Sequence, residues 1–249
     1  MSRISAVFVL LAAASFAGSA AGQTSSAPQA AARTVLVATK LANVADAPMH
    51  FRAVRVTIPP GEKSSIVGAD GIIYQVSGST TVSLGEAKSI NTGEGLFIAS
   101  GRTAALQAGA GEPSIFIHFL LVVDTQLDRP VATAPALATE LYRTAAPIPG
   151  LKSGNYDLNL TRVTFPAHSP SNAPHHRTGA ALYTVLAGTG ATTVEGKTEA
   201  KASGSFIYEP TTLVHQWGNP GDQPFTFLVF NINPEGTNAV VPEAPMKVQ

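Results

Sequence analysis

The chain has 249 residues, of which 45% are apolar and 13% are charged, and its 16 basic residues balance its 16 acidic ones. The apolar fraction excludes a disordered chain, and the balanced charge argues against nucleic acid as a partner, because no net positive field attracts a polyanion. The sequence has no cysteine, which excludes a disulfide scaffold and a lipid anchor on an N-terminal cysteine.

The N-terminus has the pattern of an export signal. Arg3 precedes an apolar run over residues 4–16, and small residues follow at positions 19–22. This pattern is typical of a secretory signal peptide over residues 1–22, followed by a flexible leader over residues 23–33. We therefore expect an exported protein, periplasmic or extracellular, that is not held at a membrane after cleavage. The alternative is an uncleaved anchor, for which the apolar run is short.

After the leader, short runs rich in Val, Ile, Phe and Thr end at Gly, Pro, Asn or Asp. This rhythm predicts many antiparallel strands in a sandwich or barrel. The expected strands cover residues 34–38, 50–58, 72–76, 80–84, 95–98, 114–123, 158–165, 181–186, 191–194, 205–208 and 224–232. One weak helical stretch is expected over residues 134–143, inside a connector.

The two halves of the chain resemble each other. Residues 54–59 (VRVTIP) correspond to residues 161–166 (TRVTFP). Six positions recur in order: Gly95, Phe97, Ile98, Thr103, Gln107 and Gly109 match Gly204, Phe206, Ile207, Thr212, Gln216 and Gly218. Matches in this order favour duplication. We predict two similar β-domains, at residues 34–124 and 151–249, joined by a connector at residues 125–150.

Histidines are the candidate metal ligands, and they are unevenly distributed between the two halves. Four of the six histidines lie in the second half, and three of them, His175, His176 and His215, fall where a site could form. Neighbouring residues of a strand point to opposite faces, so either His175 or His176 should face inward. Imidazoles that meet inside a barrel are ligands for Zn, Fe, Mn, Ni or Cu.

Here the second half resembles the cupins. Gly204, Pro210, His215 and Asn219 fit the second cupin signature, Gly-x5-Pro-x-Gly-x2-His-x3-Asn, with Thr212 in place of its middle glycine. The resemblance implies an all-β bicupin fold: two tandem double-stranded β-helix (jelly-roll) barrels of antiparallel strands. It also implies a divalent metal ion in the barrel, and it allows a homo-oligomer, because cupin barrels often pair edge to edge.

The first cupin signature, Gly-x5-His-x-His-x(3,4)-Glu-x6-Gly, is incomplete. Counting back from Gly188 places Ala181 in the glutamate position, and the second histidine position falls on His176 or Arg177. The first histidine position falls on Pro174 or His175. A third imidazole could come from His168 or from the outer member of the 175/176 pair. Glu195 and Glu209 are the nearest alternative carboxylates, and Glu209 is expected in a turn.

The first half retains none of these ligands. Counting back from Gly78 places Gly71 in the glutamate position. The histidine positions fall on Ile66 or Val67 and on Ser64 or Ser65, and Leu106 replaces the second-signature histidine. We therefore expect an N-terminal barrel filled without metal.

The pocket is predicted in the C-terminal barrel. Its candidate metal ligands are His175, His176 and His215, and Tyr183 and Tyr208 are candidates for small-molecule contact, although aromatic residues at such positions also serve as core. The expected function is binding of a small molecule, with a non-standard divalent metal site. The alternatives are a metal-dependent enzyme of the dioxygenase or isomerase type and a structural or storage-like bicupin with relic sites.

Overall fold

The computed structural model describes residues 30–244, so the predicted signal peptide and most of the predicted leader lie outside the described residues. The first half contains β1 (Ala32–Val44), β2 (Met49–Ile58), β3 (Lys63–Val67), β4 (Asp70–Ser77), β5 (Ser79–Ser83), β6 (Ala87–Asn91), β7 (Gly95–Ile98), β8 (Thr103–Ala108), β9 (Ser114–Val123), a 3-10 turn η1 (Asp124–Gln126) and β10 (Leu137–Arg143). The second half contains β11 (Gly154–Phe165), β12 (His175–Arg177), β13 (Ala180–Ala187), β14 (Thr189–Val194), β15 (Lys197–Ala202), β16 (Phe206–Glu209), β17 (His215–Gly218), β18 (Phe225–Pro234) and β19 (Val240–Pro242). Within this part of the chain there is no helix of the length and apolar character that a bilayer span requires.

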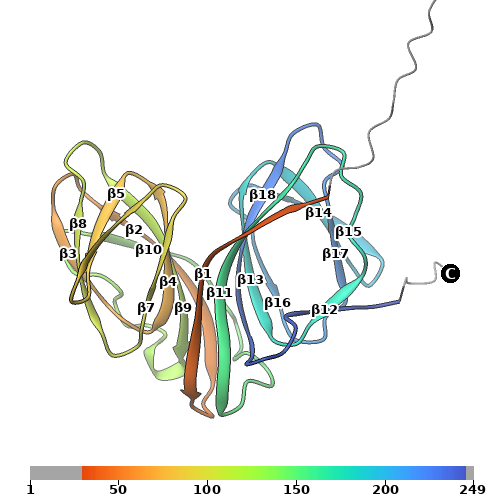
Figure 1. Cartoon of the computed structure of the whole chain (residues 1–249), viewed down its shortest axis with the longest axis horizontal. Coiled ribbons are helices and arrows are strands. Elements are labelled where there is room, and N and C mark those ends of the chain that lie inside the picture. Colours follow the sequence, from red (N-terminus) through yellow and green to blue (C-terminus); the bar gives the residue numbers. More distant parts are fainter. Residues whose placement is uncertain (1–29, 245–249) are drawn as a thin grey trace, which may run out of the picture.

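The strands form two barrels that lie side by side (Figure 1), and each barrel is made of two sheets. In the N-terminal barrel the sheet orders are β10-β2-β9-β4-β7 and β3-β8-β5-β6. In the C-terminal barrel they are β1-β11-β18-β13-β16 and β15-β14-β17-β12-β19. The pairing is antiparallel throughout, which confirms the predicted all-β fold of two antiparallel jelly-roll barrels.

The first strand of the chain belongs to the sheet of the second barrel. β1 pairs with β11 along nearly its whole length, from Ala32 opposite Thr164 to Val44 opposite Gly154. In Figure 1 it runs between the two barrels, beside β11. The predicted boundaries place residues 34–124 in the N-terminal domain, but the long edge of β11 offers β1 a more extended partner than its own half does.

The equivalent edge position of the N-terminal barrel is filled by β10. It pairs with β2, with Leu137 opposite Thr57 and Arg143 opposite Arg52. The predicted helix over residues 134–143 is therefore wrong, since the open edge of β2 provides backbone hydrogen bonds that outweigh a weak local helical preference.

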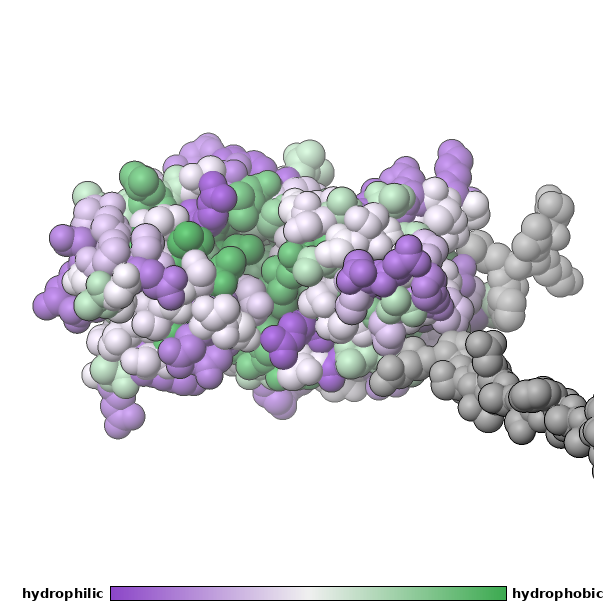
Figure 2. Space-filling model, turned by 90° about the horizontal axis from the view of Figure 1, so that it is seen from above, coloured by the Kyte–Doolittle hydropathy of each residue, from purple (hydrophilic) through white to green (hydrophobic). Residues whose placement is uncertain are grey.

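The two large sheets face each other and bury a shared core. Phe51 and Phe119 from the first half contact Phe230 from the second, with ring centroids 5.3 Å and 5.6 Å apart. Leu158 and Leu182 add fully buried side chains to the same cluster. On the face seen in Figure 2, apolar atoms gather toward the middle of the molecule, where the barrels meet. This continuous core holds the barrels together.

In the N-terminal barrel, serine and leucine occupy the positions that correspond to His175 and His215. Ser64 lies opposite Leu106 in the β3–β8 pair, as His175 lies opposite His215 in the other barrel. Ile66 and Leu106 are buried in an aliphatic cluster that fills this barrel. Apolar side chains therefore fill the space beside these two positions.

One buried polar side chain of this barrel has no hydrogen-bond partner within residues 30–244. His118, on β9, is fully buried, and neither of its ring nitrogens has a hydrogen-bond partner among residues 30–244. Burial, with a smaller effect of the positive charge of Arg52, lowers the pKa of His118 from 6.5 to about 3. The folded chain therefore keeps this imidazole neutral at pH values where the unfolded chain protonates it.

This burial predicts a loss of stability in mild acid. Between pH 6.5 and about 3 the unfolded state binds one proton more than the folded state at His118, so the unfolding free energy falls as the pH falls. We expect His118→Leu to reduce the stability difference between pH 7 and pH ~4.5 by about 2–3 kcal/mol, measured by urea unfolding. His168→Asn, at an exposed loop histidine with positive φ, is the control and should retain the wild-type dependence. An unchanged pH dependence in His118→Leu would contradict the prediction.

Candidate functional site

The inward faces of β12 and β17 bring two of the predicted histidines together. His175 and His215 are directly opposite each other in the β12–β17 pair, and their ring centroids lie 4.2 Å apart. Both side chains are buried, as are Arg177 and Trp217 two residues further along each strand. The two-residue period of a strand places all four on the same face, toward the barrel interior.

His176 lies on the other face of β12. It is half-buried, and its Nδ1 lies 2.6 Å from Oε1 of Glu243, close to β19. The three-histidine ligand set predicted from the sequence is therefore not assembled, because strand alternation separates His176 from His175 and His215. The choice that the sequence left open is settled: His175 faces inward and His176 faces outward.

An ion pair occupies the centre of the C-terminal barrel. Nε of Arg177 lies 3.2 Å from Oε2 of Glu209, and it also donates to the hydroxyl of Tyr183 over 2.9 Å. The second oxygen of Glu209 accepts a hydrogen bond of 2.9 Å from the indole of Trp217. Nε2 of His215 lies 3.0 Å from Oε2 of Glu209. All of these side chains are buried, so they form one polar network enclosed by the barrel.

Glu209 supplies a carboxylate next to the place where the cupin signature expects one. It is the last residue of β16 and lies opposite Ala181 on β13. The small side chain of Ala181 leaves room for a carboxylate from the neighbouring strand. Glu209 was expected in a turn, but it is the last residue of β16, and the turn begins one residue later, at Pro210. The spacing of two between Ile207 and Glu209 was the available signal, because it places both on one face.

Contacts with neighbouring groups determine the pKa of the buried carboxylate of Glu209. Burial alone would raise the pKa of Glu209, but the contacts with His215 and Arg177 hold it below its usual value. Burial raises the pKa of Tyr183 well above its usual value, so the phenol stays protonated. Burial also lowers the pKa of His175, with further contributions from His215 and Arg177. At neutral pH the site therefore contains a carboxylate, a guanidinium and a neutral phenol.

The two inward histidines are oriented as metal ligands often are. Nδ1 of His175 lies 3.0 Å from the carbonyl oxygen of Ala173, and Nδ1 of His215 lies 2.9 Å from that of Leu213. A carbonyl only accepts, so Nδ1 donates in both rings and Nε2 points into the barrel. Metal-binding histidines are commonly held by such a bond through the other ring nitrogen.

The rest of the site does not fit a divalent ion. The carboxylate oxygen nearest His215 also contacts the Arg177 guanidinium, so an ion bound there would lie beside a fixed buried cation. Two imidazoles and one carboxylate that is already paired lack the charge to offset that repulsion. Within residues 30–244, no group of three or more His, Cys, Asp or Glu side chains is arranged to hold a metal ion.

The two predicted ligand-binding tyrosines lie in different environments. Tyr183 points into the barrel, where it stacks on Trp217 with ring centroids 5.1 Å apart. Tyr208 precedes Glu209 on β16 and therefore faces the other way, toward the contact between the barrels, where it packs edge-on against Phe51 at 6.1 Å. Tyr183 is thus part of the network inside the barrel, and Tyr208 is not.

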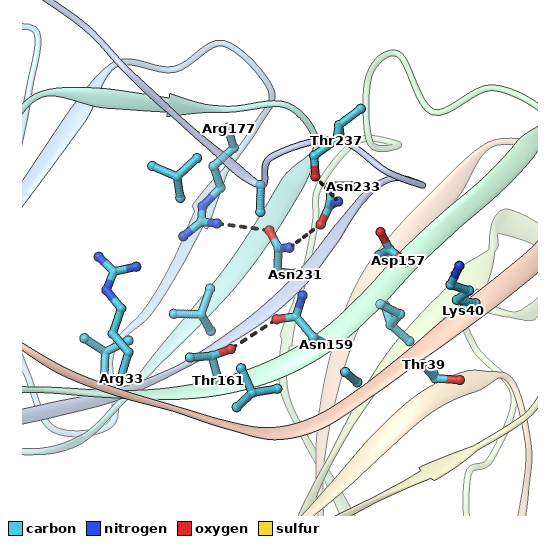
Figure 3. A pocket seen from close by; sticks show the side chains of 17 residues that line it. Arg33, Thr39, Lys40, Asp157, Asn159, Thr161, Arg177, Asn231, Asn233 and Thr237 are labelled. Atoms are coloured by element: carbon cyan, nitrogen blue, oxygen red, sulfur yellow. Dashed lines mark hydrogen bonds between the residues drawn. The ribbon is translucent and has the colours of Figure 1, made fainter.

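A cavity of about 630 Å³ opens beside this network, in the mouth of the C-terminal barrel (Figure 3). Its walls come from β1, β11 and β18 and from the segment before β19, and Arg177 lies at one end. The inward residues of β11 and β18 that line it are Asp157, Asn159, Thr161, Val163, Val229, Asn231 and Asn233. The strand alternation that fills the deeper barrel with Phe165, Phe225 and Phe227 thus provides polar groups at its mouth.

A chain of hydrogen bonds connects the buried arginine to the cavity wall. Nη1 of Arg177 donates to Oδ1 of Asn231 over 3.0 Å, and Nδ2 of Asn231 donates to Oδ1 of Asn233 over 2.8 Å. On the neighbouring strand β11, Thr161 donates to Oδ1 of Asn159 over 3.2 Å (Figure 3). Sequence reasoning missed these asparagines, although the alternation Phe230-Asn-Ile-Asn233 indicates two amides on one face of an apolar strand.

Fold and site together define a double jelly-roll barrel with a polar cavity in its second half. Residues 161–231 match the family described as the cupin domain, which covers the strands that bear the site. This match and the two tandem jelly-roll barrels support the predicted resemblance to the cupins and a bicupin-like architecture. No curated protein matches the chain by sequence.

Several solved structures share the fold at low sequence identity. Oxalate decarboxylase from Lactobacillus farciminis, in a formate complex, is 13% identical over 84% of this chain and 88% of its own, with a TM-score of 0.54. AerE from Microcystis aeruginosa is 14% identical over 80% of this chain and 98% of its own, with a TM-score of 0.52. Salicylate 1,2-dioxygenase from Pseudaminobacter salicylatoxidans is 12% identical over 77% of this chain and 76% of its own, with a TM-score of 0.51. At these identities the likeness shows the fold alone.

Proposed function

We propose that this bicupin binds a small polar molecule in the cavity of its C-terminal barrel, and that Arg177, rather than a metal ion, provides the central positive charge of the site. The observation that supports this most directly is the cavity of about 630 Å³. It has the size of typical small-molecule sites, with an apolar wall and a few convergent polar groups. The signal-like N-terminus supports the further proposal that the protein acts after export, in the periplasm or outside the cell.

Blocking the cavity should abolish binding. Thr161 lies on the cavity wall, and Thr161→Phe would fill part of the space without removing a residue of the buried ion pair. A ligand at 100 times its Kd should raise the Tm of the wild type by about 5–10 °C, and this rise should be lost in Thr161→Phe. The measurement is a thermal-shift screen of a diverse metabolite library with protein purified without a histidine tag.

Thr193→Phe is the matched control, because Thr193 lies in the same barrel but lines a different surface depression. It should respond to ligands as the wild type does. Equal stabilisation of the wild type and Thr161→Phe by every hit would contradict the proposed cavity. Metal analysis of the same preparations tests the alternative: a stoichiometric ion lost in His175→Ala and His215→Ala would favour a metal-dependent enzyme.

A further inference from the structure

Two arginines from distant parts of the sequence converge at one end of the cavity. Arg177 is on β12, and Arg33 is on β1, the strand that the first half of the chain adds to the C-terminal barrel. In Figure 3 their guanidinium groups lie at the same end of the pocket. Both also line a second, narrow cavity of about 20 Å³ next to His175 and Tyr183. We propose that this end of the cavity is a carboxylate site and that the ligand is a small organic acid, an inference that rests on the proposed binding function.

Arg177 retains hydrogen-bonding capacity for such a group. A guanidinium has five N–H donors. Nε bonds to Tyr183 and Glu209, one Nη bonds to Asn231, and the other Nη bonds again to Tyr183. Two of the five N–H groups therefore remain for a ligand. Because the existing contacts hold the guanidinium rigidly, little side-chain entropy is lost when it binds a planar carboxylate.

Of the two arginines, only Arg33 has a positive charge that no carboxylate of the described residues balances. The charge of Arg177 is balanced by Glu209, which lies on its buried side. Arg33 is exposed, and its guanidinium makes no hydrogen bond or ion pair with another residue between 30 and 244. The arginine end of the cavity therefore carries one net positive charge, which one carboxylate would neutralise. The planar fork of each arginine matches the geometry of a carboxylate.

The other end of the cavity offers a hydrogen-bond acceptor rather than positive charge. Asp157 lies there beside Lys40 (Figure 3), and Lys40 is paired with Glu235. One carboxylate oxygen of Asp157 accepts a long hydrogen bond of 3.3 Å from the backbone of Gly236, which leaves capacity for a ligand donor. The cavity thus suits an organic acid that has a hydroxyl or ammonium group at its far end, with an apolar middle against Val163 and Val229.

Arg33→Gln tests the inference with little risk to folding, because the side chain is exposed and forms no bond within residues 30–244. The probes are matched pairs that differ only in the carboxylate: glucuronate with glucose, and 4-hydroxyphenylacetate with 4-hydroxyphenylethanol. The library screen is extended in the same way, each acid with its alcohol or amide. We expect binding to be concentrated among the acids, and Arg33→Gln to raise their Kd by roughly 10- to 100-fold in isothermal titration calorimetry.

Arg55→Gln is the control, because Arg55 is an exposed strand arginine of the other barrel and should leave every Kd unchanged. Neutral compounds that bind in the wild type, are blocked by Thr161→Phe and are unaffected by Arg33→Gln would overturn the carboxylate site while supporting the cavity. If no compound of either kind binds, the proposed function and this inference both fail.

Discussion

Glu209→Gln is expected to lower the free energy of unfolding by about 3–5 kcal/mol, the largest effect of any single polar replacement in the C-terminal barrel. The substitution leaves the Arg177 guanidinium buried without a counter-charge, and Arg177 is only 6% exposed. The uncharged amide also loses the contact with His215. Urea unfolding at pH 7 measures the effect, and a cost below about 1 kcal/mol would show that the pair is not closed in solution.

A double variant separates the charge effect from simple loss of packing. Arg177→Met together with Glu209→Leu removes both charges, so it should be more stable than Glu209→Leu alone. The pH dependence gives an independent check. The pKa of Glu209 is held below its usual 4.5, so its contribution is fully present above that value and is lost as the pH falls through the folded-state pKa. Glu209→Leu should lack this component of the acid transition.

Arg177→His is expected to convert the ion pair into a metal site. The spacing His175-x-Arg177, followed by Ala181 and Gly188, fits the intervals of the first cupin signature, with substitutions at its first glycine (Ser169), its second histidine and its glutamate. An imidazole at position 177 would face inward beside His175 and His215, and Glu209 would be released from its guanidinium partner. Zn²⁺ or Co²⁺ should then bind at least ~100-fold more tightly than to the wild type.

Cobalt absorption and calorimetry measure this gain, and the Tm of the variant should rise when metal is added. Arg177→Gln is the matched control, since it removes the cation but adds no ligand, and it should not reach this affinity. If Arg177→His folds but binds Co²⁺ no more tightly than Arg177→Gln, the inward geometry of β12 is wrong. Equal metal affinity in the wild type would instead show that Arg177 does not block the site.

Most of the strands could be predicted because their residues alternate within one short segment. The expected strand over residues 114–123 coincides with β9, and residues 50–58 correspond to β2 within one residue. Two of the strands that were missed, β12 and β17, are short and are held in place by partners far along the chain. The helix expected at residues 134–143 failed for the same reason, since the free edge of β2 decides the conformation of that segment.

The histidine site could be predicted only in part. Spacing in the second signature identified His215, and spacing in the first pointed to the 175/176 pair, because motif intervals preserve which residues share a barrel face. The same spacing left His175 and His176 unresolved, since one residue of register exchanges the two faces of a strand. The spacing from Ile207 could have shown which face Glu209 takes, but not that it meets Arg177. Arg33 reaches the site from a strand whose pairing no local interval encodes.

The sequence by itself determined the duplicated all-β architecture, the loss of metal ligands in the first barrel and the absence of a glutamate at position 181. These features depend on turn residues, alternation and motif intervals, which are local properties of the chain. Only the tertiary structure decided what replaces the metal ligands, because the Arg177–Glu209 pair and the contribution of Arg33 arise where strands far apart in sequence meet. At that meeting point burial selects the partners: a guanidinium enclosed in a barrel requires a nearby carboxylate, whichever strand supplies it.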